Sequence, residues 1–163
     1  MSNESINIRK IQPEDNESIE KIIRNCFYEL NIPLTGTAYE DDDIKNMYEA
    51  YQDERDVYYV VANSNKILGG AGIKVLKDTD GSICELNKMY FSPELRGKGY
   101  GKKLFQKCLN AAKELGYKQC YLESGPRLKA AIHIYESFGF KHLNGSIGGT
   151  GHYSCSVWMI KDL

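Results

Sequence analysis

The chain has 163 residues, of which 42% are hydrophobic and 26% charged, with a formal net charge of −1. This balance is typical of a globular protein and excludes low-complexity and disordered classes. The length falls in the usual range for one domain, so residues 1–163 are expected to form a single domain.

The N-terminal part of the chain predicts one strand and two helices. Alternating isoleucines indicate a strand over residues 6–11. Apolar residues then recur at helical spacing over 14–30, which predicts an amphipathic helix. Residues 31–40 contain proline and glycine and are expected to form a loop. A shorter helix should follow from the acidic run 41–43, whose charges suit a helix N-terminus.

The middle of the chain predicts three strands. Residues 57–62 and 66–73 are two β-prone segments separated by a short polar turn, which indicates a hairpin. After a turn rich in aspartate and glycine, residues 83–91 are expected to form a third strand. Consecutive strands joined by such short turns are expected to pair antiparallel.

The C-terminal part predicts alternating helices and strands. Helices are expected over residues 99–115 and 128–138, a strand over 119–123, and a closing strand over 153–160. Antiparallel strands followed by a strand, helix, strand unit predict a mixed sheet with helices on its faces, in the α/β (α+β) class.

The nearly neutral net charge hides two regions of opposite sign. Acidic residues outnumber basic ones by 13 to 4 over residues 14–56, whereas residues 94–118 carry seven basic and two acidic side chains. The first region would favour a cationic partner and the second a phosphorylated one. Solvated helix faces are the alternative interpretation, and they are favoured for the acidic region.

A glycine-rich loop over residues 93–102 joins a strand to the N-terminus of a helix. Glycines let the backbone approach a ligand, and the free amides and the helix dipole attract an anion. The side chains of Arg96, Lys98, Lys102 and Lys103 add positive charge, so a pyrophosphate is predicted here. The spacing matches neither a Walker loop nor a dinucleotide-binding fingerprint.

Two motifs carry a resemblance to a known family. Residues 96–101 read RGKGYG and match the pattern Arg/Gln-x-x-Gly-x-Gly/Ala, while residues 130–140 are similar to Ala-Ile-x-x-Tyr-x-x-x-Gly-Phe. With both motifs in this order, most of the chain resembles the GNAT superfamily of N-acetyltransferases. The resemblance implies a mixed, mostly antiparallel central sheet with helices on both faces, in the order β-α-α-β-β-β-α-β-α-β.

The resemblance also implies acetyl-CoA as the acyl donor and no metal. The backbone of the preceding strand would pair with the pantetheine arm of the donor, and loop amides would bind its pyrophosphate. The strand residues implied are Met89, Tyr90 and Phe91. The loop residues implied are Arg96, Gly97, Lys98, Gly99, Tyr100, Gly101 and Lys102.

Transfer to an amine needs a base for the amine proton and an acid for the departing thiolate. Tyr135 matches the family's acid, with a plain core aromatic as the alternative. Glu85 and Glu123 match two family positions for the base, with Glu85 slightly preferred, and the alternative is a carboxylate paired with a lysine such as Lys88. His152, in a glycine-rich stretch before the last strand, is a third candidate for the base.

The resemblance therefore implies an enzyme that moves an acetyl group to a primary amine of a small molecule, a protein lysine or an N-terminus, by direct attack in a ternary complex. A non-catalytic module that binds acyl-CoA as a sensor is the alternative. A nucleic-acid partner is not expected because the basic stretch is short and one phosphate loop explains it. The sequence leaves the acceptor's identity open and allows a homodimer.

The N-terminal segment lacks the charged start and unbroken apolar run of a signal peptide, and no stretch approaches the length of a membrane span. We therefore expect a cytoplasmic protein with no membrane partner. The five cysteines are an odd set without a C-x-x-C pair, which indicates reduced, mostly buried thiols rather than a disulfide framework or a zinc site.

Overall fold

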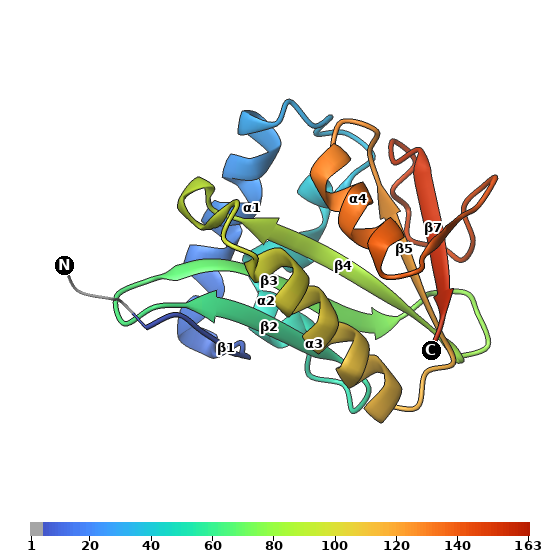
Figure 1. Ribbon diagram of the computed structural model, residues 1–163, viewed down its shortest axis with the longest axis horizontal. Helices are drawn as coiled ribbons and strands as arrows, with labels where there is room; N and C mark the ends of the chain where they lie inside the picture. Colours follow the sequence, from blue (N-terminus) through green and yellow to red (C-terminus); the bar gives the residue numbers. More distant parts are fainter. Residues whose placement is uncertain (1–4) are drawn as a thin grey trace.

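The computed structural model describes residues 5–163, and within them seven strands form one sheet in the order β1-β2-β3-β4-β5-β7-β6 (Figure 1). The strands are β1 (Asn7–Lys10), β2 (Val57–Ala62), β3 (Ile67–Val75), β4 (Ile83–Phe91), β5 (Gln119–Ser124), β6 (Lys141–His142) and β7 (Val157–Asp162). The α-helices are α1 (Asn16–Glu29), α2 (Met47–Ala50), α3 (Tyr100–Glu114) and α4 (Lys129–Ser137).

The sheet is mixed but mostly antiparallel. Only the pairing of β4 with β5 is parallel among the six pairings of the described residues. Figure 1 shows α3 and α4 in front of the sheet and α1 behind it. The side chains of β2 alternate accordingly, because Val57 and Val61 join the core cluster of α3, while Tyr58 and Val60 join that of α1. The predicted fold class is confirmed.

Two predicted elements differ in the structure. The helix expected from residue 41 is a 3-10 helix (Asp42–Lys45) followed by the single turn of α2, because the backbone leaves helical geometry at Asn46 (φ −137°, ψ 53°). The closing strand begins at Val157 rather than at residue 153, since Ser154 instead donates its amide to the carbonyl of Gly36 at 2.9 Å.

The short strand β6 was not predicted. Its two residues are both exposed, so they carry no apolar alternation that could mark a strand. Among the described residues, no helix is long and apolar enough to cross a membrane.

Strands β4 and β5 separate soon after they meet. They pair only where Ile83 to Glu85 lie beside Gln119 to Tyr121. Strand β4 then continues to Phe91 with a bulge, at which Lys88 adopts a φ of 51° and the register with β3 shifts. The main chain of β4 beyond Glu85 is therefore not paired with β5.

Tyr58 holds this bulge in place from β2, the strand on the other side of β3. Its hydroxyl donates a buried hydrogen bond of 2.8 Å to the carbonyl oxygen of Lys88. The ring reaches that carbonyl by lying directly against Gly70 and Gly72, where an added Cβ would come within 2.5 and 2.6 Å of ring atoms. Glycines in β3 thus provide the space that the ring needs.

Replacing Gly70 with alanine should lower the free energy of unfolding by about 1–3 kcal/mol, because the new methyl group must displace the Tyr58 ring. Urea unfolding followed by circular dichroism measures this change. Gly145→Ala is the matched control, since a Cβ there meets no atom within 4 Å. Equal stability of the two variants would show that the ring does not depend on the glycine.

Candidate active site

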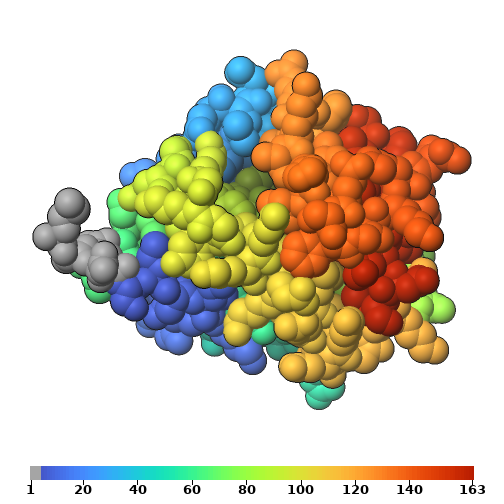
Figure 2. Space-filling view, viewed as in Figure 1, coloured from blue at the N-terminus to red at the C-terminus, as the bar shows by residue number. Residues whose placement is uncertain are grey.

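A cavity of about 280 Å³ lies where β4 and β5 separate. Its walls come from the two strands, from the loop after α1, from the loop between β5 and α4 and from the loop before β7. The polar and charged residues that line it include Thr37, Glu85, Asn87, Lys88, Glu123, Ser124, Arg127, His152 and Cys155. Figure 2, which views the molecule from the side of α3 and α4, shows a recess between the yellow-green segment before α3 and the orange segment that contains α4.

Glu85 lies on β4 and is only 9% exposed. One carboxylate oxygen accepts a hydrogen bond of 2.9 Å from the side-chain amide of Asn87. The amide oxygen of Asn87 in turn accepts one of 2.6 Å from the hydroxyl of Tyr51. Burial of Glu85 raises its pKa, with Asn87 and nearby positive charges opposing. The Glu85 carboxylate is therefore fixed in position by Asn87, and it binds a proton more strongly than an exposed glutamate does.

Glu123 lies on β5, on the same face of the sheet as Glu85. One carboxylate oxygen accepts a hydrogen bond of 2.6 Å from the hydroxyl of Tyr121, and the other accepts one from the hydroxyl of Thr150. Both oxygens of Glu123 are therefore already hydrogen-bonded within the chain.

His152 reaches the same cavity from the loop before β7. Its Nε2 lies 2.9 Å from a carboxylate oxygen of Asp41, and its Nδ1 lies 3.9 Å from one of Glu123. Burial disfavours protonation of this ring, but the hydrogen bond to Asp41 and the charges of Asp41 and Glu85 outweigh burial and raise its pKa. The three residues predicted as alternative bases therefore lie together in one cavity.

Asp41 is a residue of this cluster that the sequence did not identify. The sequence placed it at a helix N-terminus, but its carboxylate instead binds His152 and accepts a hydrogen bond of 2.9 Å from Nζ of Lys88. Burial alone would raise the pKa of Asp41, yet these two partners lower it. The predicted alternative pairing of Lys88 with Glu85 is wrong, because Lys88 bonds to Asp41. The acidic run 41–43 was the only signal in the sequence.

Two loops come together over the cavity and bring Asp41 to His152. Ser154 donates its amide to the carbonyl of Gly36 at 2.9 Å and its hydroxyl to the carbonyl of Thr35 at 2.6 Å. These bonds join the loop after α1 to the loop before β7. The contact between Asp41 and His152 thus belongs to a larger closure over the cavity.

The cluster also contains atoms that could serve as ligands of a divalent cation. One ligand atom each from Glu85, Glu123 and His152 lies within 4.8 Å of the others. Carboxylate oxygens and imidazole nitrogens are common zinc ligands. The expected absence of a metal therefore stays a prediction.

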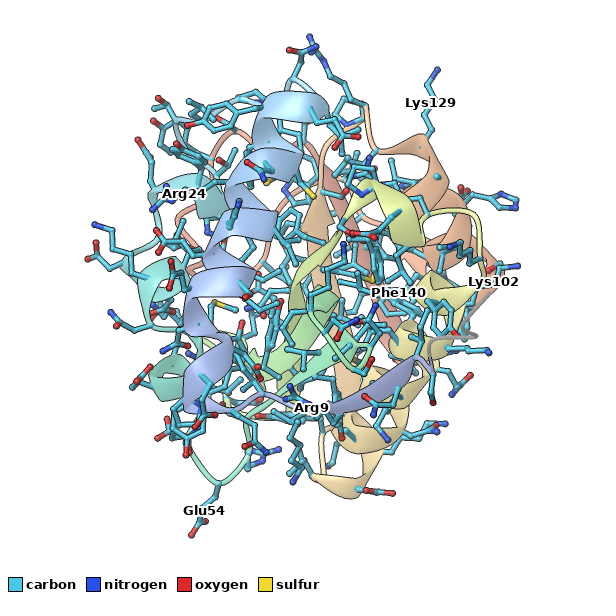
Figure 3. All side chains as sticks on the ribbon, turned by 90° about the vertical axis from the view of Figure 1, so that its left-hand side faces the viewer. Arg9, Arg24, Glu54, Lys102, Lys129 and Phe140 are labelled. Carbon is cyan, nitrogen blue, oxygen red and sulfur yellow. The ribbon has the colours of Figure 1, made fainter. Side chains whose placement is uncertain are left out.

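The glycine-rich loop has the geometry of an anion site. Gly97 and Gly99 have φ values of 76° and 81°, and a Cβ on either would meet no atom within 4 Å. Helix α3 begins at Tyr100, so the amides of its first turn have no carbonyl partner within the helix. Lys102, labelled in Figure 3, projects outward from this turn.

Arg96 has a different environment from the one predicted. Its guanidinium donates to the carbonyl of Phe91 at 2.9 Å and forms an ion pair with Glu29. The Arg96 side chain therefore connects the loop to β4 and α1, and the carboxylate of Glu29 offsets the positive charge of the guanidinium. Gly101 packs against α4, since a Cβ there would lie 3.2 Å from Ile134.

The remaining predicted residues lie on β4 and α4. Met89, Tyr90 and Phe91 occupy the part of β4 that has separated from β5, and Tyr90 lines the cavity. Tyr135 is buried on α4 and its ring centroid lies 5.3 Å from that of Phe105. Burial raises the pKa of Tyr135. The cavity lining does not include this residue.

Comparison with known proteins identifies the family that this chain matches. The family model described as acetyltransferase (GNAT) family matches residues 17–140. The uncharacterized N-acetyltransferase YjgM of Escherichia coli is 38% identical over 157 residues, which cover 96% of this chain and 94% of the relative.

Two solved structures share the fold. One is an acetyltransferase from Salmonella typhimurium with its cofactor acetyl-CoA, with a TM-score of 0.78 and 20% identity, over 96% of this chain and 93% of the other. The second is an N-acetyltransferase from Thermoplasma acidophilum in complex with coenzyme A, with a TM-score of 0.76 and 21% identity, over 98% and 99%.

Replacing Asp41 with asparagine should lower the pKa of His152, because the carboxylate charge is lost while burial and Lys88 still disfavour the imidazolium. Titration of the ring signals by NMR measures this pKa, with the exposed ring of His142 as the internal control. In the wild type, protonated His152 should stabilise the fold below the unfolded-state pKa of about 6.5. That stabilisation is lost as pH rises through the folded-state pKa. An unchanged His152 titration in the variant would contradict this account.

Proposed function

Because this chain belongs to the acetyltransferase (GNAT) family, we propose that it moves the acetyl group of acetyl-CoA to a primary amine by direct attack in a ternary complex. The observation that carries the proposal is the meeting of Glu85, Glu123 and His152 in one cavity beside the separated strands. A base for the amine and a gap for an extended donor then lie side by side.

The donor is acetyl-CoA, which supplies an activated acetyl thioester. Solved neighbours in complex with acetyl-CoA or coenzyme A support this choice. The open backbone at Gly97 and Gly99 and the first amides of α3 suit the pyrophosphate. The exposed cations Lys98 and Lys102 add long-range attraction. The part of β4 that β5 leaves unpaired suits the amides of the pantetheine arm, as an added strand would.

Glu85 is the general base. Both oxygens of Glu123 already accept hydrogen bonds, and the raised pKa of His152 holds a proton on its ring over a wider pH range. Within residues 5–163 the carboxylate of Glu85 accepts a hydrogen bond only from Asn87, and burial raises its pKa toward the range in which a carboxylate is an effective base. Glu123 and His152 then position the amine and balance the charge.

We propose the following sequence of steps, in which Tyr135 keeps the role that the family motif implies. Glu85 takes a proton from the bound ammonium, directly or through one water molecule. The freed nitrogen lone pair attacks the thioester carbonyl carbon, and the carbon–sulfur bond breaks with its electron pair on sulfur. The nitrogen gives its second proton to solvent as the amide forms, and Glu85 later returns the proton it took to solvent. Tyr135 donates its phenolic proton to that sulfur and regains a proton from solvent. Burial raises the pKa of Tyr135 above that of an exposed phenol, so the phenol is protonated at neutral pH.

The acceptor is a small cationic amine. Glu85 and Glu123 offer two neighbouring carboxylates to an ammonium group. The other charged side chains around them, Asp41, Lys88, Arg127 and protonated His152, leave no net negative charge, so it is these two carboxylates that favour a cationic ligand. The two joined loops enclose the cavity, which favours a small molecule over a folded protein substrate.

Glu85→Gln should lower kcat by about 10²- to 10⁴-fold, because it removes the proton acceptor and keeps the shape. The assay follows thiol release from acetyl-CoA over a panel of amines, amino acids and lysine peptides. Glu54→Gln is the matched control, since Glu54 projects from the surface in Figure 3. A fully active Glu85→Gln variant would reassign the base to Glu123 or His152. Binding of acetyl-CoA without turnover of any amine would favour the sensor function.

Tyr135→Phe should lower kcat by about tenfold to a hundredfold while the Kd for coenzyme A stays the same, since the ring still packs on Phe105. Steady-state kinetics give kcat, and calorimetric titration gives Kd. Tyr153→Phe is the control because Tyr153 is 76% exposed. Unchanged turnover in Tyr135→Phe would remove this residue from the mechanism.

A further inference from the structure

Ser124 has an unusual hydroxyl group. Among the described residues, its Oγ is the buried side-chain nitrogen or oxygen atom for which no hydrogen-bond partner is found. The residue is 5% exposed and ends strand β5. Native proteins rarely leave a buried hydroxyl unpaired, because the lost hydration is not replaced. Such a group therefore calls for an explanation.

Ser124 lies on the donor side of the sheet. Side chains alternate along a strand, so Ser124 shares a face with Cys120 and Leu122 and points away from Glu123. Cys120 and Leu122 belong to the core cluster that contains the buried side of α3. The glycine-rich loop begins α3, so it lies on this same face. Ser124 also lines the cavity.

The separation of the strands leaves this hydroxyl without a neighbour across the gap. The pairing of Glu85 with Tyr121, continued in register, would set Ser124 beside Lys88. The strands have parted before that point, and the Lys88 carbonyl already accepts the hydroxyl of Tyr58. Ser124 therefore stands beside the widened part of the gap.

We infer that the hydroxyl of Ser124 hydrogen-bonds the thiol-bearing end of the pantetheine arm, and so holds the thioester in register with Glu85. This inference rests on the proposed function, since it assumes that coenzyme A lies between β4 and β5. Pantetheine carries amide groups along its length, and an amide can donate to or accept from a serine hydroxyl. No hydrogen bond holds the hydroxyl in its buried position, so it is free to rotate about the Cα–Cβ bond toward a ligand in the cavity that Ser124 lines. Ser124 is thus a positioning residue for the donor.

Ser124→Ala tests this role through two quantities that should move in opposite directions. Removal of an unpaired buried hydroxyl should raise the Tm of the free protein by about 2–4 °C. Loss of one hydrogen bond to the ligand should raise the Kd for coenzyme A about threefold to tenfold. Differential scanning calorimetry of the free protein gives Tm, and isothermal titration with coenzyme A gives Kd.

Ser137→Ala is the matched control. Ser137 is exposed on α4, and its hydroxyl donates to the carbonyl of Ile134 at 2.6 Å. Its Kd for coenzyme A should stay within twofold of the wild type, as expected of a surface change. A lower Tm of free Ser124→Ala, or an unchanged Kd, would overturn the inference. Wild-type protein that fails to bind coenzyme A would instead contradict the proposed function itself.

Discussion

The divergence of β4 from β5 after Glu85 is the constraint on which the site depends. The bulge at Lys88 turns β4 aside, and the buried hydrogen bond from Tyr58 fixes the carbonyl of that residue. Glycines in β3 give the Tyr58 ring its place. The resulting gap forms the cavity, leaves part of β4 unpaired, and joins the face of the glycine-rich loop to the face of the carboxylates.

Charge in the cavity is organised around a contact between distant segments. Asp41 holds both Lys88 and His152, and the loops that carry Asp41 and His152 are joined through Ser154. Within residues 5–163 the carboxylate of Glu85 keeps one hydrogen-bond partner, Asn87, and burial raises its pKa. In this arrangement Glu85 accepts the proton, while other residues of the same cavity position a cationic amine.

The sequence predicted what depends on local pattern. Strand 83–91 was predicted from the turn before it, helix α3 from its apolar stripe, and the anion loop from glycines before a helix. Glu85 and Glu123 were predicted from family positions and His152 from the glycine-rich stretch before the last strand, but the clustering of the three side chains was not predicted. The role of Asp41 and the Tyr58 bond are contacts across 111 and 30 residues, which no local spacing encodes. The helix predicted from residue 41 is interrupted because the backbone leaves helical geometry at Asn46.

Hydrogen–deuterium exchange with and without acetyl-CoA tests most directly whether the donor lies in the gap. The account predicts that bound acetyl-CoA slows exchange of the amides in β4 beyond Glu85 and in the first turn of α3. Exchange of the amides in β1, an edge strand away from the gap, should be unaffected. Unchanged exchange in β4 and α3 at saturating acetyl-CoA would contradict it.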